Sequence, residues 1–570
     1  MDTLDSMNYL ADCLQRQGKL AEAEEMYCKV IALKTKILGH DHPSTLTSRN
    51  SLGSLYVAKD QWAEAKAICL AVLEARTRVF GEENKDTLAS MHNLALCLKN
   101  QGKLAEAEEM YCKVIALKTK ILGHDHPSTL TSRHNLGSLY VAKGQWEKAE
   151  AIFLPVLEAH TRVFGEENMD TLDSMHHLAV CLQDQGKMAE AEEMYCKVIA
   201  LSTKVLGDDH PSTLTSRHNL GSLYVAKGQW EEAKAIFLPV VEVRTRVFGE
   251  ENMETLSSMH ELARCLENQG KLAEAEEMYS KVIALKTKIM GYDHPSTLIS
   301  RHNLGLLYTD KGQWEEAKAI LLPVVEVRTR VFGEENMETL SSMHILALCL
   351  QDQGKLAEAE EMYCKVIALR TKVLGDDHPS TLTSRHNLGS LYIAKGQWEE
   401  AKAILLLVVE AHTRDFGEEN MDTLSSMHEL AHCLEKQGKL AEAEEMYSKV
   451  IALRTKILGD DHPSTLTSRH NLGSLYAEQG QWEKAEVILV PAVEARTRVL
   501  GNNHERTLST RKWLEFVQQS RTASRSNDNA EGMEGSSDQS AFDSDNHNEE
   551  EDDDDDIDDA SGDEEEERAE

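Results

Sequence analysis

The 570 residues predict an all-α solenoid of stacked antiparallel helix pairs. A Thr-Leu dipeptide recurs every 42 residues from Thr3 to Thr507, which gives twelve full units across residues 3–506. Within a unit the apolar residues follow helical spacing in two blocks, and a glycine separates the blocks. Self-similarity at a fixed period is the signature of a repeat array, so one array is expected rather than several globular domains.

The segment 127–165 shows how one unit encodes a helix pair. Leu130, Leu136 and Leu139 recur at the spacing of one helical face, and Gly144 follows where that helix should stop. A second helical stripe then begins at Trp146. It continues through Ala149, Ile152, Phe153, Val156 and Leu157.

The helix starts are also encoded. His126-Pro127 places the fixed backbone angle of proline at the expected first helical position. Sister units instead carry an asparagine at the position of His126, and the side chain of asparagine accepts a hydrogen bond from a free N–H group of a helix start. These expected caps are Asn84, Asn168, Asn252, Asn336 and Asn420.

Two unit types alternate, so the full repeat is 84 residues long. One reads QGKLAEAEEMYCKVIALKTKILG, at 101–123, and the other KGQWEEAKAIFLPVVEVRTRVFG, at 227–249. The second type carries a proline within its longer helix, where a bend is expected. These prolines are Pro155, Pro239, Pro323 and Pro491.

The residue order of a unit resembles the tetratricopeptide repeat. Leu136-Gly137, Leu139-Tyr140 and Gly144 are followed by Trp146, Ala149 and Phe153, with a small residue where two helices cross. HEAT and armadillo pairs share the repeat length but lack this order. The Gly-Lys-Leu-x-Glu-Ala-Glu run and the Leu-Gly-x-Asp-His-Pro linker are similar to kinesin light chain repeats and to repeats of fungal and bacterial sensor proteins. The resemblance implies a right-handed superhelix whose inner wall is the first helix of every pair.

Kinesin light chains precede their repeats with a heptad coiled coil that docks on the heavy chain. This sequence instead opens directly in a repeat, at Met1 to Leu4. A kinesin-type motor is therefore a weaker expectation as a partner than an extended peptide segment held in the concave groove that such arrays form.

The groove wall is expected to carry two polar columns. The first, which the resemblance places toward the groove, contains His92, His134, His176, His218, His260, His302, His344, His386, His428 and His470, and Asn8 and Asn50 complete it. The second contains Asn93, Asn135, Asn219, Asn303, Asn387 and Asn471. In the motor light chains, asparagines at these positions hold the ligand backbone, which makes both columns candidate peptide-binding residues.

Two interpretations of the histidine column stay open: ligand contact, or packing between helices. Recent duplication copies residues whether or not they are used, as the unchanged copy of 17–49 at 101–133 shows. If the histidines kept their ordinary pKa near 6.5, mild acidification would charge them together. The groove would then attract acidic segments such as residues 521–570.

The C-terminal part is expected to differ from the array. Residues 507–519 form an amphipathic helix in which Trp513 caps the open end of the stack. Residues 520–570 are expected to be a disordered tail, since 521–570 hold 22 acidic and 3 basic residues. With a net charge of -36, the chain is a poor candidate for nucleic acid and a better one for basic protein partners.

The remaining motifs give no sign of catalysis or of a cofactor. Eleven cysteines follow the repeat period, and serine replaces some of them, so reduced, buried thiols are expected, together with a cytoplasmic or nuclear location. No apolar run is long enough for a membrane helix. The linkers His40-Asp-His42 and His124-Asp-His126 contain metal-ligand types, but the other linkers lack the first histidine, and no metal is expected. The six repeat tryptophans, Trp62 to Trp482, are expected in the core.

The sequence therefore predicts a non-catalytic scaffold or cargo-type adaptor that binds extended peptide segments. The alternative is the ligand-sensing repeat array of a larger signalling protein, of the kind used in innate immunity. An adjoining nucleotide-binding domain would favour the sensor, whereas a separate coiled-coil partner would favour the adaptor.

Overall fold

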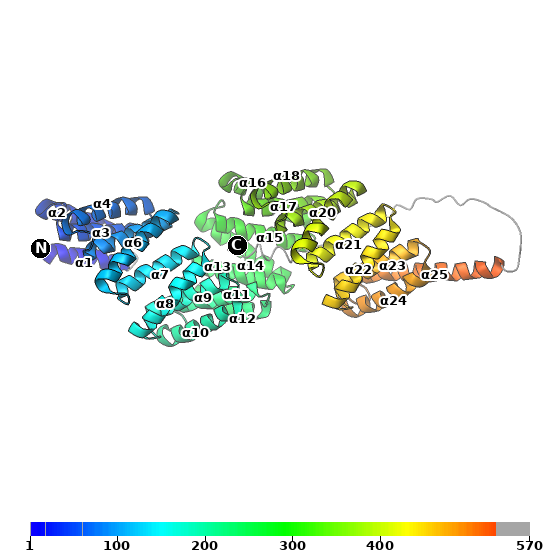
Figure 1. Ribbon diagram of the computed structural model, residues 1–570, viewed down its shortest axis with the longest axis horizontal. Helices are drawn as coiled ribbons and strands as arrows, with labels where there is room; N and C mark the ends of the chain where they lie inside the picture. Colours follow the sequence, from blue (N-terminus) through cyan, green and yellow to red (C-terminus); the bar gives the residue numbers. More distant parts are fainter. Residues whose placement is uncertain (1, 17–18, 60, 532–570) are drawn as a thin grey trace. The chain divides into compact units, whose positions relative to one another are not determined.

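The computed structural model of the chain describes residues 2–16, 19–59 and 61–531. Every regular element in these residues is an α-helix, and the helices belong to two compact units, residues 1–269 and 270–570. Within each unit, consecutive helices pack side by side in chain order (Figure 1). The predicted all-α array of helix pairs is confirmed. Residues 532–570, most of the predicted disordered tail, lie outside the described residues.

The helices of the first unit are α1 (Asp2–Arg16), α2 (Leu20–Leu38), α3 (Pro43–Ala58), α4 (Trp62–Phe80), α5 (Lys85–Asn100), α6 (Leu104–Leu122), α7 (Pro127–Val141), α8 (Trp146–Phe164), α9 (Met169–Asp184), α10 (Met188–Leu206), α11 (Pro211–Ala226), α12 (Trp230–Phe248) and α13 (Met253–Asn268). Those of the second are α14 (Leu272–Met290), α15 (Pro295–Asp310), α16 (Trp314–Phe332), α17 (Met337–Asp352), α18 (Leu356–Leu374), α19 (Pro379–Ala394), α20 (Trp398–Phe416), α21 (Met421–Lys436), α22 (Leu440–Leu458), α23 (Pro463–Glu478), α24 (Trp482–Val499) and α25 (Glu505–Glu531).

The predicted caps lie at the helix starts. Asn84 precedes α5, and its Oδ1 accepts a hydrogen bond from the backbone N–H of Asp86 at 2.9 Å. His126 precedes α7 and accepts from the N–H of Ser128 through Nδ1 at 3.2 Å, while Pro127 is the first helical residue. Each cap satisfies one of the N–H groups that a helix start leaves free, which fixes where the helix begins.

Glycines mark the helix ends, as predicted. α7 ends at Val141, and Gly144 then adopts a φ of 62°, a left-handed conformation that costs glycine little. At the end of α6, Gly123 has a φ of 95° and donates its backbone N–H to the carbonyl of Thr119. At these helix ends the chain therefore turns sharply without backbone strain.

The two helices of a pair cross at a small residue. A Cβ atom added to Gly137 of α7 would lie 2.7 Å from Cε1 of Phe153 in α8, closer than side chains tolerate. The sister pairs use a fully buried alanine, such as Ala95 of α5. The predicted small residue at the crossing is confirmed, and its cause is this close approach.

Neighbouring pairs are joined by a charged group that recurs along the array. Glu108 of α6 accepts hydrogen bonds from the Tyr140 hydroxyl at 2.9 Å and from Lys143 Nζ at 2.5 Å; Tyr140 lies at the end of α7 and Lys143 just after it. The equivalent groups around Glu24, Glu192 and Glu360 repeat this contact. One carboxylate therefore fixes a pair against the next at every second junction of the array.

Several expectations of burial were wrong in part. Cys97 and Cys181 are buried, but Cys28, Cys112, Cys196 and Cys364 are exposed, because their column lies on the solvent side of the even-numbered helices. All eleven cysteines lie in the described residues, and none of them is joined to another by a disulfide. The repeat tryptophans are half-buried, because each is the first residue of its helix and only its inner edge reaches the core.

The C-terminal helix is longer than predicted. α25 begins at Glu505 and ends at Glu531, so it continues beyond Gln519, where a disordered tail was expected to begin. Its first part packs on the last pairs through buried Val517 and half-buried Trp513 and Leu514. In the described part of the chain, no helix is long and apolar enough to span a lipid bilayer.

Candidate peptide-binding wall

The odd-numbered helices form one wall of each unit. α3 contacts α5, α5 contacts α7, and the same contact recurs through α9, α11 and α13, although an even-numbered helix always stands between them in sequence. It recurs in the second unit from α15 to α25. No pair of even-numbered helices within the described residues makes contact as extensive. The odd-numbered helices are therefore the more closely spaced, which places them on the inner side of each stack.

The predicted histidines lie between neighbouring helices of this wall. The ring of His344 on α17 is within hydrogen-bonding distance of α19 at both nitrogens: Nδ1 lies 3.3 Å from Ser384 Oγ, and Nε2 lies 3.1 Å from Asn387 Nδ2. The edge of the ring also meets Tyr363, with 5.6 Å between ring centroids. This histidine therefore joins two helices of the wall.

The same arrangement recurs along the column. The Nδ1-to-serine distance is 3.0 Å for His92 and His176, 3.1 Å for His218, and 3.2 Å for His302 and His428. The asparagine one repeat later reaches Nε2 in the pairs Asn135–His92, Asn219–His176 and Asn471–His428. The two columns found in the sequence thus form one network rather than two separate ligand-binding rows.

A buried cation completes the network. Arg370 of α18 donates to Ser384 Oγ at 3.0 Å, and the hydroxyl of Ser384 donates in turn to the carbonyl of Ser380 at 3.1 Å. A hydroxyl has one proton, so Ser384 can only accept from His344. His344 must therefore carry its proton on Nδ1 and leave Nε2 to accept from the Asn387 amide.

These hydrogen bonds require neutral imidazole rings, and burial also favours the neutral form. The pKa of His344 is lowered to about 3, first by burial and then by the nearby charge of Arg370. Burial also lowers the pKa of His92 and His218 to about 4 and those of His428 and His470 to about 3. For these histidines the expectation of charging on mild acidification was wrong, because burial removes the water that would stabilise the charge.

The asparagine column is partly buried. Asn303 is buried, and Asn93 donates to Ser54 Oγ at 3.3 Å on the preceding wall helix. The structure brings the predicted columns together at helix contacts, while their contact with a ligand stays a prediction.

A further column on the wall escaped the sequence analysis. Three residues before each histidine stands a side chain that faces solvent in much of the array, and its identity changes from copy to copy. It is Thr47, Ala89, Thr131, Asp173, Ser257 and Ile299 in six of the units. Variation among otherwise similar copies was the signal available in the sequence.

The linker histidines are caps. His42 accepts from the N–H of Ser44 through Nδ1 at 3.2 Å, as His126 does from Ser128. The first histidine of each His-Asp-His linker contacts an arginine instead: His40 meets Arg49, and His124 meets Arg133. These roles explain why the second histidine recurs in most linkers, whereas the first does not.

Comparisons with known proteins agree with this architecture. The family model described as tetratricopeptide repeat matches ten stretches, of which consecutive ones overlap except the last: residues 2–68, 50–120, 100–159, 138–204, 170–246, 218–288, 254–322, 296–372, 342–414 and 422–489. A search of curated proteins found no match.

Among solved structures, similar ones are kinesin light chain-like repeat proteins. One is a Podosopora anserina protein of this type with nearly identical TPR-like repeats, at 35% identity, with 36% of this chain and 97% of that chain covered and a TM-score of 0.33. A variant of that protein gives 34% identity with the same coverage and TM-score. BtubC (BKLC) from P. vanneervenii gives 18% identity, covers 41% of this chain and 91% of that chain, and has a TM-score of 0.35.

The family model matches far more than half of the chain, and the helix pairs repeat with its period. The chain therefore belongs to the tetratricopeptide repeat family, whose fold is a scaffold for interactions between proteins.

Proposed function

We propose that the chain is an adaptor that holds extended, basic peptide segments against the wall of odd-numbered helices. The observation that carries this proposal is the row of side chains on closely spaced parallel helices that faces solvent in six of the repeats, most of them in the first unit. An extended peptide can contact such a row at regular intervals, as it does in other repeat proteins.

The charge of the wall supports a basic ligand. The solvent-facing column and the asparagine column include the carboxylates Asp5, Asp173, Glu261 and Glu429, and neither column contains a lysine or an arginine. Complementary charge steers a partner toward a surface and disfavours partners of like charge. The acidic residues 532–570 add a further attraction for basic partners, in keeping with the expectation from the sequence.

The two predicted columns take different roles in this proposal. The asparagine amides and the solvent-facing column contact the peptide, with asparagine donating to peptide carbonyl groups. The histidines act indirectly, because both ring nitrogens of residues such as His344 are already engaged within the protein. They hold neighbouring helices at a fixed spacing, which sets the interval between peptide contacts.

A displayed library of random peptides, selected on the full chain, tests the proposal. We expect the enriched peptides to be basic and to lose at least about tenfold in affinity when Thr131→Trp or Ser257→Trp fills the wall. Glu147→Trp on α8 is the matched control, since Glu147 is exposed on an even-numbered helix. Absence of enriched peptides, or equal loss in the control, would overturn the proposal.

A further inference from the structure

One copy of the repeat departs from its sisters at two positions of the wall. Asp173 stands where the other copies, apart from the first with its Asp5, have small, hydroxyl or aliphatic residues, such as Thr131 and Thr215. His177 stands where six of the other eleven copies have asparagine, such as Asn135, and none of them has histidine. In an array of nearly identical copies, two changes on one helix call for a local explanation.

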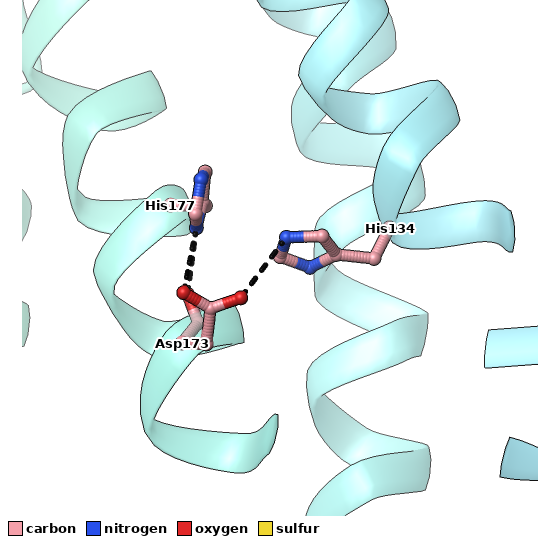
Figure 2. Close-up of side chains that lie close together, drawn as sticks. All are labelled: His134, Asp173 and His177. Carbon is pink, nitrogen blue, oxygen red and sulfur yellow. Dashed lines mark hydrogen bonds and ion pairs between the residues drawn. The ribbon is translucent and has the colours of Figure 1, made fainter. Parts of the chain in front are cut away.

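The two changes converge on one histidine of the wall column. Asp173 and His177 are four residues apart on α9 and therefore share a helix face. That face meets His134 of α7, as Figure 2 shows: Nε2 of His134 lies 3.3 Å from Asp173 Oδ2, and Nδ1 of His177 lies 3.5 Å from Asp173 Oδ1. One potential ligand atom from each side chain lies within 4.8 Å of the other two.

We propose that His134, Asp173 and His177 bind a divalent transition-metal ion of the zinc type, with one coordination position left open to the wall. Two imidazoles and one carboxylate are a ligand set that zinc accepts, with bonds of about 2.0–2.2 Å. The three atoms lie within 4.8 Å of one another, so ion binding requires the side chains to draw closer together.

The surroundings suit such a site. Nδ1 of His134 lies 3.5 Å from Ser174 Oγ, and its ring packs edge-on against Phe153, so Nε2 is held toward α9. This kind of outer contact orients a metal-binding imidazole.

The structure also shows from which side an ion can reach the three residues and which existing contacts compete with it. The His134 side chain is 11% exposed, whereas those of His177 and Asp173 are 34% and 59% exposed, so an ion enters from the wall side. Neighbouring His176 is not a fourth ligand, because its two nitrogens are engaged by Ser216 and Asn219. Nδ1 of His177 now lies 2.9 Å from the carbonyl of Asp173, and ion binding replaces that contact.

Titration of the metal-free full chain with Zn²⁺ and Co²⁺ tests the site. Calorimetry should show one tightly bound ion per chain, separate from weak binding by the many carboxylates. Bound Co²⁺ should show the visible absorption of a site with few ligands. His177→Asn and Asp173→Thr install the residues of sister copies and preserve the fold. Each variant should lower the affinity for the tightly bound ion about tenfold or more. Unchanged affinity in both variants would overturn the proposal.

The repeat also allows the site to be copied. Ser257 and Glu261 hold the equivalent positions beside His218, one full 84-residue repeat later. The double variant Ser257→Asp, Glu261→His should bind a second tight equivalent. Failure to bind it would contradict the claim that these three side chains suffice. Neither result depends on peptide binding, so this proposal and that of the peptide wall fail separately.

Discussion

The side-chain amide of Asn135 on α7 donates to Nε2 of His92 on α5, 3.2 Å away. An amide nitrogen can only donate, so Nε2 must be an acceptor and His92 must carry its proton on Nδ1, facing Ser132 Oγ at 3.0 Å. Protonation of His92 would put two donors face to face. One residue pair thus links the spacing of two wall helices to the charge state of a histidine.

The first prediction concerns pH. In the folded protein the pKa is about 4 for His92 and about 3 for His344 and His428, against an ordinary value of 6.5, and burial is the main cause in all three. The charges of Lys118, Arg370 and Arg454 lower the pKa further for His92, His344 and His428, respectively. For His428, Glu429 raises the pKa, whereas His432 and His386 lower it. The unfolded chain therefore binds more protons between pH 6.5 and 4, so stability is present above pH 6.5 and is lost as the pH falls. Circular dichroism during thermal unfolding at several pH values should show melting temperatures that fall across this range.

Asparagine, which already occupies this column at Asn50, provides the matched control. Ser90 donates to Asn50 Oδ1 at 3.3 Å, so a side-chain amide can replace the imidazole ring in the contact with the serine, and an amide does not titrate. Replacing His92, His344 and His428 together with asparagine should preserve helicity and flatten the pH dependence. An unchanged pH dependence would assign it to other groups.

The second prediction concerns the serine at the centre of the network. Ser132 accepts from Lys118 Nζ at 2.9 Å and lies 3.0 Å from His92 Nδ1. Ser132→Ala leaves these buried donors without their partner and should cost about 1–3 kcal/mol of unfolding free energy. Thr131→Ala, one residue earlier and exposed, should change it by less than about 0.5 kcal/mol in urea denaturation. Equal effects would show that the network contributes little.

The third prediction concerns the helix crossing. Gly137→Ala places a methyl group 2.7 Å from a Phe153 ring carbon. Alanine is favoured over glycine in a helix by about 1 kcal/mol, yet the clash should produce a net loss of about 1–3 kcal/mol. Ser138→Ala, on the same helix and half-buried, has no such clash. Denaturant midpoints of the two variants measure the difference, and a stabilised Gly137→Ala protein would contradict it.

The fourth prediction concerns the thiols. Cys13, Cys28, Cys112, Cys196 and Cys364 are exposed, whereas Cys69, Cys97, Cys181, Cys265, Cys349 and Cys433 are buried. A thiol-alkylating reagent followed by peptide mass mapping should label the first group in the native protein and the second only after unfolding. Partial burial raises the pKa of Cys112, so this thiol should react more slowly than a free thiol. Rapid native labelling of Cys97 would show that the array opens readily.

The linear pattern of residues was sufficient for the fold. The period, the caps at Asn84 and His126 and the stop at Gly144 predicted the helix pairs, because each depends on neighbours within a few residues. The end of α25 was missed, since a polar, charged segment carries no apolar stripe to distinguish a helix from a tail.

The candidate site depended on contacts between residues about 40 positions apart. The histidine and asparagine columns were found as patterns, but their mutual hydrogen bonds, and the depressed pKa values that burial causes, exist only once neighbouring wall helices pack. The same packing brings His134 against Asp173 and His177. Local rules determine where helices begin and end, whereas desolvation and side-chain partners are properties of the packed array.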